Sequence, residues 1–188
     1  MATPSNNNST TKSKSFVRRN KKRVLRRNGE SQAIHCMLAP TRQDQLLLPT
    51  GVMAEVIDYT EPTKMDNAPP WLLGQIEWNQ RQVPVFSFSS LINAEDVGDI
   101  PAKSKVLIIK SLGDTARVPY LGILLSELPR LLNVKESDLV ETGDDKKSLG
   151  VFSWIKLDDQ SAIVPDLDRL THLVNHAAFG ALPITQLN

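Results

Sequence analysis

Histidine and cysteine side chains are the first candidates for chemistry, because they bind metals and act as bases and nucleophiles. His172 and His176 are four residues apart in a segment with helical periodicity, so their imidazoles share one face, where two histidines can bind zinc. The segment HLVNH lacks the glutamate of a zincin motif, and no third ligand is identifiable. We therefore favour solvent-facing histidines over a metal site.

The other reactive residue types form no catalytic arrangement either. His35 and Cys36 are adjacent in a predicted strand, so they should point to opposite faces, and no base is placed to activate the thiol. The nine glycines are scattered without forming a phosphate-binding loop, and the acid pairs Asp144-Asp145 and Asp158-Asp159 lie in predicted turns or loops. The sequence predicts no catalytic residue, no metal and no cofactor, and so a protein that is not an enzyme.

Charge is distributed unevenly along the chain. The 22 Lys and Arg residues nearly balance the 21 Asp and Glu residues, but residues 1–29 hold nine of the bases and none of the acids. We expect a basic N-terminal arm, residues 1–30, that is disordered because it has little apolar surface to bury. A short basic helix at Phe16–Arg27 would be marginal alone in water.

The arm leaves several partners open. It can bind an anionic membrane surface, bind nucleic-acid phosphates, fold over the acidic remainder of the chain or stay solvated. Phe16 is its only aromatic residue, which weakens base stacking as an explanation. Nucleic acid is therefore the least favoured partner.

Length and composition bound the class of protein. A chain of 188 residues suits one domain or two small ones, and Cys36 is the only cysteine, so no intramolecular disulfide is possible. No apolar run approaches the roughly 18 residues of a membrane span, and the N-terminus has no apolar signal segment. We expect a cytoplasmic protein whose folded body occupies residues 31–188.

Short apolar runs separated by turn residues predict a mainly β body. One helix is expected after Asp166, a preferred N-cap residue, with apolar residues at helical spacing up to Gly180. A second helical segment is expected at Leu128–Val134 or Lys135–Val140, and residues 141–148 form a solvated loop. The predicted strands are Ile34–Leu38, Gln45–Pro49, Val52–Tyr59, the hairpin Gly74–Phe88, Val106–Lys110, Val118–Leu125, Gly150–Leu157 and Ser161–Pro165.

One unusual pattern occurs twice. Gly74-x3-Trp78 is followed by Val83-Pro84, and Gly150-x3-Trp154 is followed by Val164-Pro165, with five more residues between Trp and Val-Pro in the second copy. Each Trp should face a core, and each Pro should mark an edge strand or a strand end, because Pro cannot donate to a central ladder. The pattern indicates either two related halves or a chance similarity between two amphipathic hairpins.

The residues around the first copy resemble a known family. The run APPWLLGQIEWNQRQVPVFSFSSLI is similar to the signature region of CheW-like domains, the bacterial chemotaxis coupling proteins. AEVIDYTEP resembles the family's strand before its proline loop, and GVFSWIKLDDQSAIVPDLDRL its C-terminal strand pair and helix. The resemblance covers about residues 31–179. It implies two small five-stranded, SH3-like β-barrels around a shared core, with a C-terminal α-helix, as two pseudo-repeated halves.

The same resemblance implies candidate partner-binding residues. Glu55 and Gly74 match the family pattern, whereas the family's Asn-Leu-Arg-Gly falls on Glu77-Trp78-Asn79-Gln80. Asn79 therefore replaces an arginine and Gln80 a glycine, and Arg81 can offer a guanidinium from a different point. The family's aspartate after the second strand falls on Ser87, so that charge is lost. The candidate partner-binding residues are Glu55, Gly74, Asn79, Gln80 and Arg81.

The function implied by the resemblance is a non-enzymatic coupling protein. It would link the signalling tip of a methyl-accepting chemoreceptor to the regulatory domain of a CheA-type histidine kinase, in receptor arrays at the inner membrane. The departures from the signature resemble divergent CheW-like proteins of pilus chemosensory systems, which control type IV pili and twitching motility. The alternative is a β-barrel nucleic-acid-binding protein that uses the basic arm.

Overall fold

The computed structural model describes residues 32–112, 118–142 and 148–180. The chain divides into two units, residues 1–30 and residues 31–188, and all described residues belong to the second. The predicted basic arm with its candidate helix at Phe16–Arg27, and most of the predicted loop at residues 141–148, lie outside the described residues. No helix in the described part of the chain is long and apolar enough to cross a membrane.

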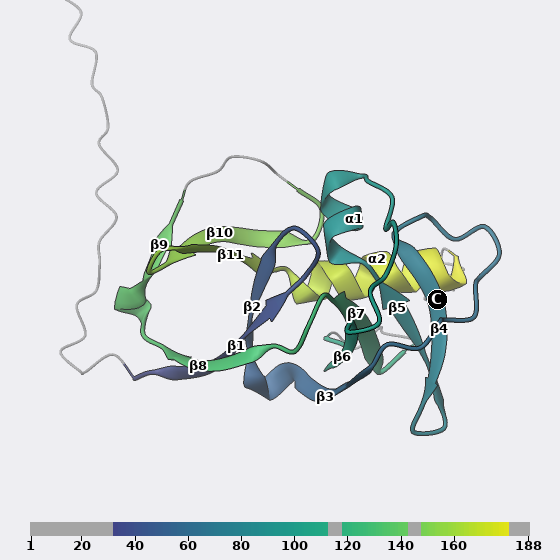
Figure 1. Cartoon of the computed structure of the whole chain (residues 1–188), viewed down its shortest axis with the longest axis horizontal. Coiled ribbons are helices and arrows are strands. Elements are labelled where there is room, and N and C mark those ends of the chain that lie inside the picture. The colour runs from purple at the N-terminus through teal and green to yellow at the C-terminus, as the bar shows by residue number, and fades with distance from the viewer. Residues whose placement is uncertain (1–31, 113–117, 143–147, 181–188) are drawn as a thin grey trace, which may run out of the picture. The chain divides into compact units, whose positions relative to one another are not determined.

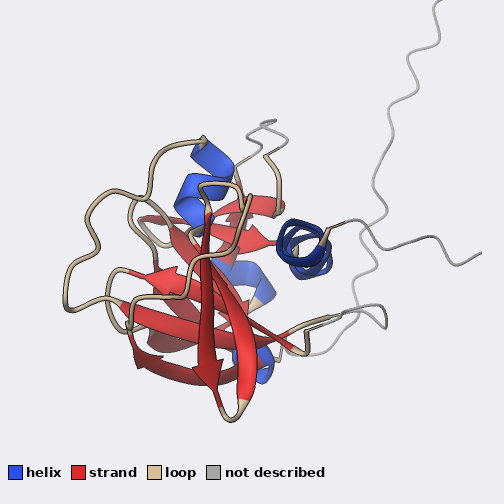
Figure 2. Cartoon of the chain, turned by 90° about the vertical axis from the view of Figure 1, so that its right-hand side faces the viewer, coloured by secondary structure: helices blue, strands red, loops and turns tan. Residues whose placement is uncertain are grey.

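The described residues form two β-sheets and two α-helices (Figures 1 and 2). The first sheet has the strand order β8-β1-β2-β11-β10-β9 and is here called barrel 1. Its strands are β1 (Ile34–Pro40), β2 (Gln45–Pro49), β8 (Arg130–Val134), β9 (Leu139–Glu141), β10 (Val151–Leu157) and β11 (Gln160–Pro165).

The second sheet has the strand order β3-β6-β7-β5-β4 and is called barrel 2. Its strands are β3 (Met53–Asp58), β4 (Leu72–Trp78), β5 (Arg81–Phe86), β6 (Lys105–Lys110) and β7 (Tyr120–Leu125). The helices are α1 (Phe88–Asn93) and α2 (Leu167–Phe179), with short 3-10 helices η1 (Thr50–Val52) and η2 (Glu136–Asp138). The mainly β, two-barrel architecture with a C-terminal helix is thus confirmed, with a three-residue sixth strand, β9, in barrel 1.

The two sheets repeat one topology. The antiparallel pair β1–β2 lies beside the hairpin β10–β11, and the antiparallel pair β6–β7 lies beside the hairpin β4–β5. In both sheets the two pairs meet through parallel strands, β2 with β11 and β7 with β5. The proline of each sequence repeat pairs with the residue that follows the repeat's glycine, Pro84 with Gln75 and Pro165 with Val151.

Strands β1 and β6 bury side chains on both faces, which explains why their sequences are unbroken apolar runs. In β1, Cys36 and Leu38 fill the interior of barrel 1, while Met37 and Ala39 enter a core shared with barrel 2. In β6, Val106 and Ile108 lie in the interior of barrel 2, whereas Leu107 and Ile109 lie in the shared core. Alternate side chains therefore serve different cores, as the period of two in a strand requires.

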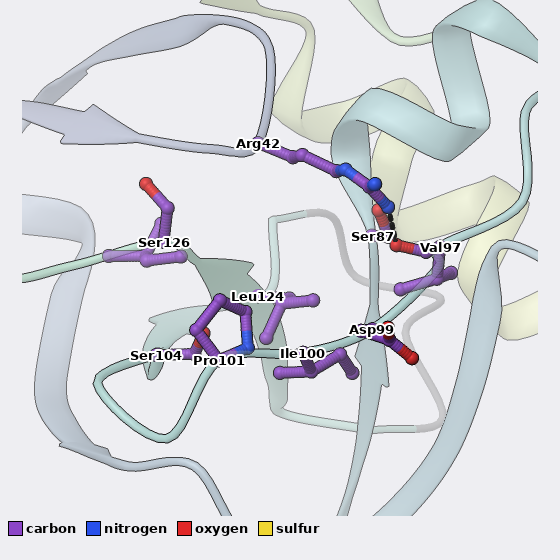
Figure 3. Close-up of a pocket in the computed structure, with 10 residues that line it drawn as sticks. Arg42, Ser87, Val97, Asp99, Ile100, Pro101, Ser104, Leu124 and Ser126 are labelled. Carbon is purple, nitrogen blue, oxygen red and sulfur yellow. Dashed lines mark hydrogen bonds between the residues drawn. The ribbon is translucent and has the colours of Figure 1, made fainter.

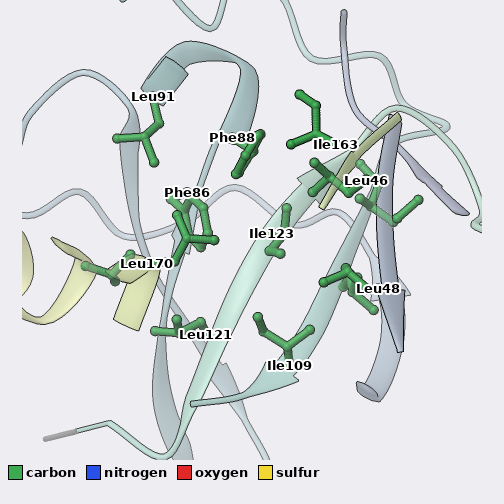
Figure 4. Packing of buried hydrophobic residues seen from close by; sticks show 14 of the residues in the cluster. Leu46, Leu48, Phe86, Phe88, Leu91, Ile109, Leu121, Ile123, Ile163 and Leu170 are labelled. Atoms are coloured by element: carbon green, nitrogen blue, oxygen red, sulfur yellow. The ribbon is translucent and has the colours of Figure 1, made fainter. Parts of the chain in front are cut away.

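The shared core joins the two barrels and α2 (Figure 4). Phe86 at the end of β5 and Phe88 at the start of α1 are fully buried, and Leu170 of α2 packs into the same cluster. Full burial of such side chains contributes about 1.5–3 kcal/mol each. The members labelled in Figure 4 are Leu46, Leu48, Phe86, Phe88, Leu91, Ile109, Leu121, Ile123, Ile163 and Leu170.

Helix α2 follows its predicted bounds. The Asp166 side chain accepts a hydrogen bond from the Arg169 amide at 2.9 Å, and Gly180 is the C-cap with φ of 74°. Leu170 and Val174 face the core, and His172 and His176 are both exposed, as expected for solvent-facing histidines. The exposed side of the helix therefore carries polar residues at the positions that the periodicity indicated.

One local prediction is wrong, and one short helix was not predicted. The expected helix at Leu128–Val134 or Lys135–Val140 is absent: these residues form β8, η2 and the start of β9. Pairing of Ile34 with Val134 and of Leu157 with Leu139 overrides the weak helical pattern. Helix α1 was not predicted, because six residues are too few for a clear helical period.

The expectation for the prolines holds at one position only. Pro165 ends β11 as expected. Pro84 lies inside β5, which runs between β4 and β7 and is not an edge strand. The parallel ladder to β7 begins at Val85, one residue later, so the missing N–H of Pro84 interrupts no ladder bond on that side.

Candidate protein-binding site

The turn between β4 and β5 holds two of the candidate residues. Asn79 and Gln80 have φ of 48° and 61°, and Trp78 pairs with Arg81 across the two-residue loop. Positive φ at both central positions is the pattern of a type I′ hairpin turn, which matches the twist of the strands. Asn adopts this conformation readily, whereas Gln is strained in it. The hairpin tip projects away from the other labelled elements in Figure 1.

Glu55 is hydrogen-bonded by Trp78, a residue that the sequence predicts to face a core. The Trp78 Nε1–H donates a hydrogen bond to Glu55 Oε2 at 2.7 Å. Glu55 lies on β3 and Trp78 on β4, the two outer strands of barrel 2. Tyr120 of β7 packs edge-on against the indole, with ring centroids 4.8 Å apart. The partly buried Trp78 also contacts the interior cluster of barrel 2, so the expectation that it faces a core is confirmed.

Arg81 completes this group. As the cross-strand partner of Trp78 it projects from the same face of the hairpin, and it is exposed. The ion pairs between described residues are Lys103–Glu127, Lys105–Asp58 and Lys156–Asp159, so Arg81 forms none of them. Glu55, Trp78, Arg81 and Tyr120 are called the tip cluster below.

Gly74 has an architectural role at some distance from the turn. Its φ is 140°, and a Cβ at this position would overlap the carbonyl oxygen of Thr63. Thr63 and Gln75 exchange two backbone hydrogen bonds, at 2.8 and 2.9 Å. These bonds hold the proline loop, residues 61–70, against the outer edge of β4. The structure therefore brings Glu55, Asn79, Gln80 and Arg81 together around Trp78, whereas buried Gly74 lies away from them and allows the loop to pack against β4.

Barrel 1 carries most of the exposed apolar side chains of the described residues. Six of the eight large hydrophobic residues that are exposed lie on its strands or beside them, and Phe152 and Leu131 are the most exposed, at 74% and 70%. These six are Ile34, Leu128, Leu131, Val140, Leu149 and Phe152. Sequence reasoning missed them and the tip-cluster member Tyr120. Alternation alone would place Phe152 on the same face as Trp154, and the register shift between Val151 and Ser153 leaves Phe152 unpaired, so no local sequence signal could have identified it as exposed.

The titratable groups behave as structural residues. Burial raises the pKa of the Cys36 thiol, and the thiol lies inside barrel 1 while His35 is exposed on the other face. Burial also raises the pKa of Asp44, with a hydrogen bond from Ser89 acting in the opposite direction. Within the described residues no three His, Cys, Asp or Glu side chains are grouped so that they could hold a metal ion.

Two SH3-like barrels that share one core and expose different side chains on each barrel define a two-barrel binding module. The chain belongs to the CheW-like family, because the CheW-like domain model matches residues 35–174. Its fold is similar to the crystal structure of the scaffolding protein TtCheW from Thermoanaerobacter tengcongensis, with a TM-score of 0.63 and 16% sequence identity, over 81% of this chain and 98% of that chain. A comparison with curated proteins found no match.

Family membership sets the general role. CheW-like domains are non-catalytic adaptors, so the protein is not an enzyme and has a coupling or scaffold role in chemosensory signalling.

Proposed function

We propose that the protein couples a chemoreceptor to a CheA-type histidine kinase by presenting one binding surface on each barrel. The observation that carries this proposal is the separation of the two surfaces. The tip cluster lies on barrel 2, whereas six of the eight exposed large hydrophobic residues belong to barrel 1. A bridging protein needs two surfaces that two partners can occupy at the same time.

Each surface has the composition of a contact site. Trp, Tyr and Arg dominate the binding energy of many interfaces, and the tip cluster combines all three around Glu55. Exposed apolar side chains such as Leu131 and Phe152 are a common mark of protein-binding surfaces. We assign the tip cluster and the turn residues Asn79 and Gln80 to one partner, and the apolar residues of barrel 1 to the other.

The test is calorimetric titration of the full chain with two partners from the same organism: the regulatory domain of the kinase and a fragment of the receptor tip. Arg81→Ala should weaken binding to one partner by about ten-fold or more, and the double variant Leu131→Ser/Phe152→Ser should weaken binding to the other. Arg169→Ala, which removes an exposed arginine of α2, is the matched control and should change neither.

Two results would contradict the proposal. If the folded wild-type chain bound neither partner, the coupling function itself would be wrong. If one variant abolished binding to both partners while remaining folded, the two partners would share a surface, and the assignment of one surface to each barrel would be wrong.

We further propose that the protein serves a pilus-type chemosensory system. This rests on the resemblance carried by the altered turn, where Asn79 and Gln80 stand in place of the family's Arg and Gly. A kinase regulatory domain from a type IV pilus gene cluster should then bind more tightly than one from a flagellar system. Equal or reversed affinities would reject this narrower assignment.

The basic arm is assigned to the membrane side of such an array. Nine Lys or Arg residues within residues 1–29 suit an anionic lipid surface, at about 1 kcal/mol for each base that reaches it. The full chain should co-sediment with vesicles containing phosphatidylserine at low salt and be released by raised salt. Co-sedimentation that is equal with neutral vesicles would contradict this role.

A further inference from the structure

A pocket of about 300 Å³ lies at the carboxyl ends of the parallel strands β5 and β7 (Figure 3). The β1–β2 turn of barrel 1 contributes Arg42, and the segment between α1 and β6 contributes the opposite wall. The floor includes the last residues of β7. The lining residues are Arg42, Ser87, Val97, Asp99, Ile100, Pro101, Ser104, Leu124, Leu125 and Ser126.

One hydroxyl that lines this pocket makes no hydrogen bond with a described residue. Ser104 is 1% exposed, and no group in residues 32–112, 118–142 or 148–180 hydrogen-bonds its hydroxyl, although its backbone N–H and C=O are both paired. The other two serines differ. Ser87 Oγ–H donates to Ser90 Oγ at 2.9 Å, and Ser126 Oγ–H donates to the Pro40 carbonyl at 3.3 Å. The enclosed side-chain atoms without a partner in the described residues are Ser111 Oγ and Trp154 Nε1, so the Ser104 hydroxyl is not one of them and can reach the pocket, where it is available to hydrogen-bond a ligand.

Two opposite charges line the same pocket. The Arg42 guanidinium donates one N–H to the carbonyl of Val97 and passes so close to Gly98 that a Cβ there would overlap it. Its other N–H groups remain donors, since a guanidinium has five. Asp99 is exposed and forms no ion pair with a described residue. A cation already fixed in place and a carboxylate without a partner suit a ligand that carries both charges.

We propose that this pocket binds a free α-amino acid with a short branched apolar side chain. Arg42 takes the carboxylate, Asp99 the ammonium group, and Ser104 a remaining hydrogen bond, while the side chain packs against Ile100, Leu124 and Leu125. A volume of about 300 Å³ is at the lower end of small-molecule pockets, which suits a ligand of this size and not a dinucleotide or a folded partner.

Such a ligand would stabilise the packing of barrel 1 against barrel 2. The β1–β2 turn is already joined to α1 by the hydroxyls of Thr41 and Ser89, 2.8 Å apart, and by an Asn93–Gln43 hydrogen bond of 2.7 Å. Arg42 belongs to the same turn, while Leu124 and Leu125 belong to barrel 2. A ligand held between them stabilises this arrangement, so that the coupling protein would respond directly to the concentration of an amino acid.

The experiment uses the full chain and saturation-transfer NMR with L-leucine, L-isoleucine and L-valine at millimolar concentration. Two truncated probes separate the charges: 4-methylpentanoate lacks the ammonium group of leucine, and isopentylamine lacks its carboxylate. We expect at least one of the three amino acids to bind and both truncated probes to bind about ten-fold more weakly or not at all.

Variants assign the contacts. Asp99→Asn should weaken amino-acid binding about ten-fold and leave 4-methylpentanoate unchanged, and Ser104→Ala should weaken it several-fold. Asp96→Asn, which removes an exposed carboxylate of the same segment that does not line the pocket, is the control and should have no effect. The proposal is overturned if none of the three amino acids binds, or if Asp99→Asn and Asp96→Asn have equal effects.

Discussion

Trp78 Nε1 lies 2.7 Å from Glu55 Oε2, and this hydrogen bond joins the two outer strands of barrel 2. Glu55 matches the family pattern, whereas Trp78 occupies a place where the family has leucine. The carboxylate therefore has an intramolecular partner in this chain. The bond links the candidate site to stability, since it holds the indole of the residue that pairs with Arg81 across the hairpin.

Replacement of Trp78 by Phe tests this bond. The variant keeps an aromatic ring against Tyr120 but removes the N–H donor, so we expect a loss of about 0.5–1.5 kcal/mol in the free energy of unfolding. Urea unfolding followed by circular dichroism measures it. Glu55→Gln keeps an oxygen acceptor and should cost less. Equal losses in both variants would mean that the hydrogen bond depends on the negative charge of Glu55, so that a neutral amide oxygen does not replace it.

A substitution in the β4–β5 turn is expected to raise the free energy of unfolding, in contrast to the loss expected at Trp78. Gln80 adopts φ of 61°, a left-handed conformation that costs an L-residue about 1–2 kcal/mol and glycine almost nothing. Gln80→Gly should therefore raise the free energy of unfolding by about 0.5–1 kcal/mol, after the greater unfolded-state entropy of glycine is included. Gln80→Ala, which keeps a Cβ, should give no gain. A destabilising glycine would show that the Gln80 side chain makes contacts that outweigh its strain.

Gly74 and Gly51 form a matched pair. A Cβ on Gly74 would overlap the Thr63 carbonyl in a backbone conformation with φ of 140°, whereas a Cβ on Gly51 has nothing within 4 Å. Gly74→Ala should lower the free energy of unfolding by about 2–3 kcal/mol or more, because backbone must move. Gly51→Ala should stay within about 0.5 kcal/mol of the wild type. Thermal and urea unfolding of both variants would show whether Gly74 is a structural residue; equal effects would contradict this.

The strands were predictable because most are short apolar runs between turn residues. The alternation of Cys36 and Leu38 with Met37 and Ala39 could not be assigned, since both sets are apolar and the pattern does not say which set faces the core shared by the two barrels. The repeat around Gly74 and Gly150 was visible, but its meaning depended on register. Each proline pairs with the residue after the glycine, which only the folded sheets reveal.

Ser87 shows a limit of motif matching. The family has an aspartate at this position, so the sequence predicts the loss of a negative charge. In the structure Ser87 is the N-cap of α1, and its oxygen accepts a hydrogen bond from the Ser90 amide at 3.3 Å. Ser and Asp are both favoured at this position, so the capping role is kept without a charge in a place that is 5% exposed.

The sequence suggested residues for the candidate site but not the contacts between them. Asn79, Gln80 and Arg81 were recognised from the signature, and Glu55 from the strand before the proline loop. Nothing local connects Glu55 with Trp78, or Trp78 with Tyr120, because barrel closure brings together strands that are distant in sequence. The exposed apolar residues of barrel 1 were missed for the same reason: alternation identifies a face, and only tertiary packing decides whether it is covered.

Asp44 predicts a pH dependence of stability. Burial raises the pKa of its carboxyl above the ordinary value of 3.8, although the bond from Ser89 opposes the shift. Because the folded-state pKa exceeds the unfolded one, the contribution of Asp44 is fully present below the unfolded pKa and is lost as the pH rises through the folded pKa. Asp44→Asn stays neutral, so its stability relative to the wild type should increase as the pH rises from about 3.8 and then level off.

Urea unfolding of both proteins between acidic and neutral pH measures the difference. Asp96→Asn, which removes an exposed carboxylate nearby, corrects for net charge. A relative stability of Asp44→Asn that falls with rising pH would show that the hydrogen bond from Ser89 outweighs burial.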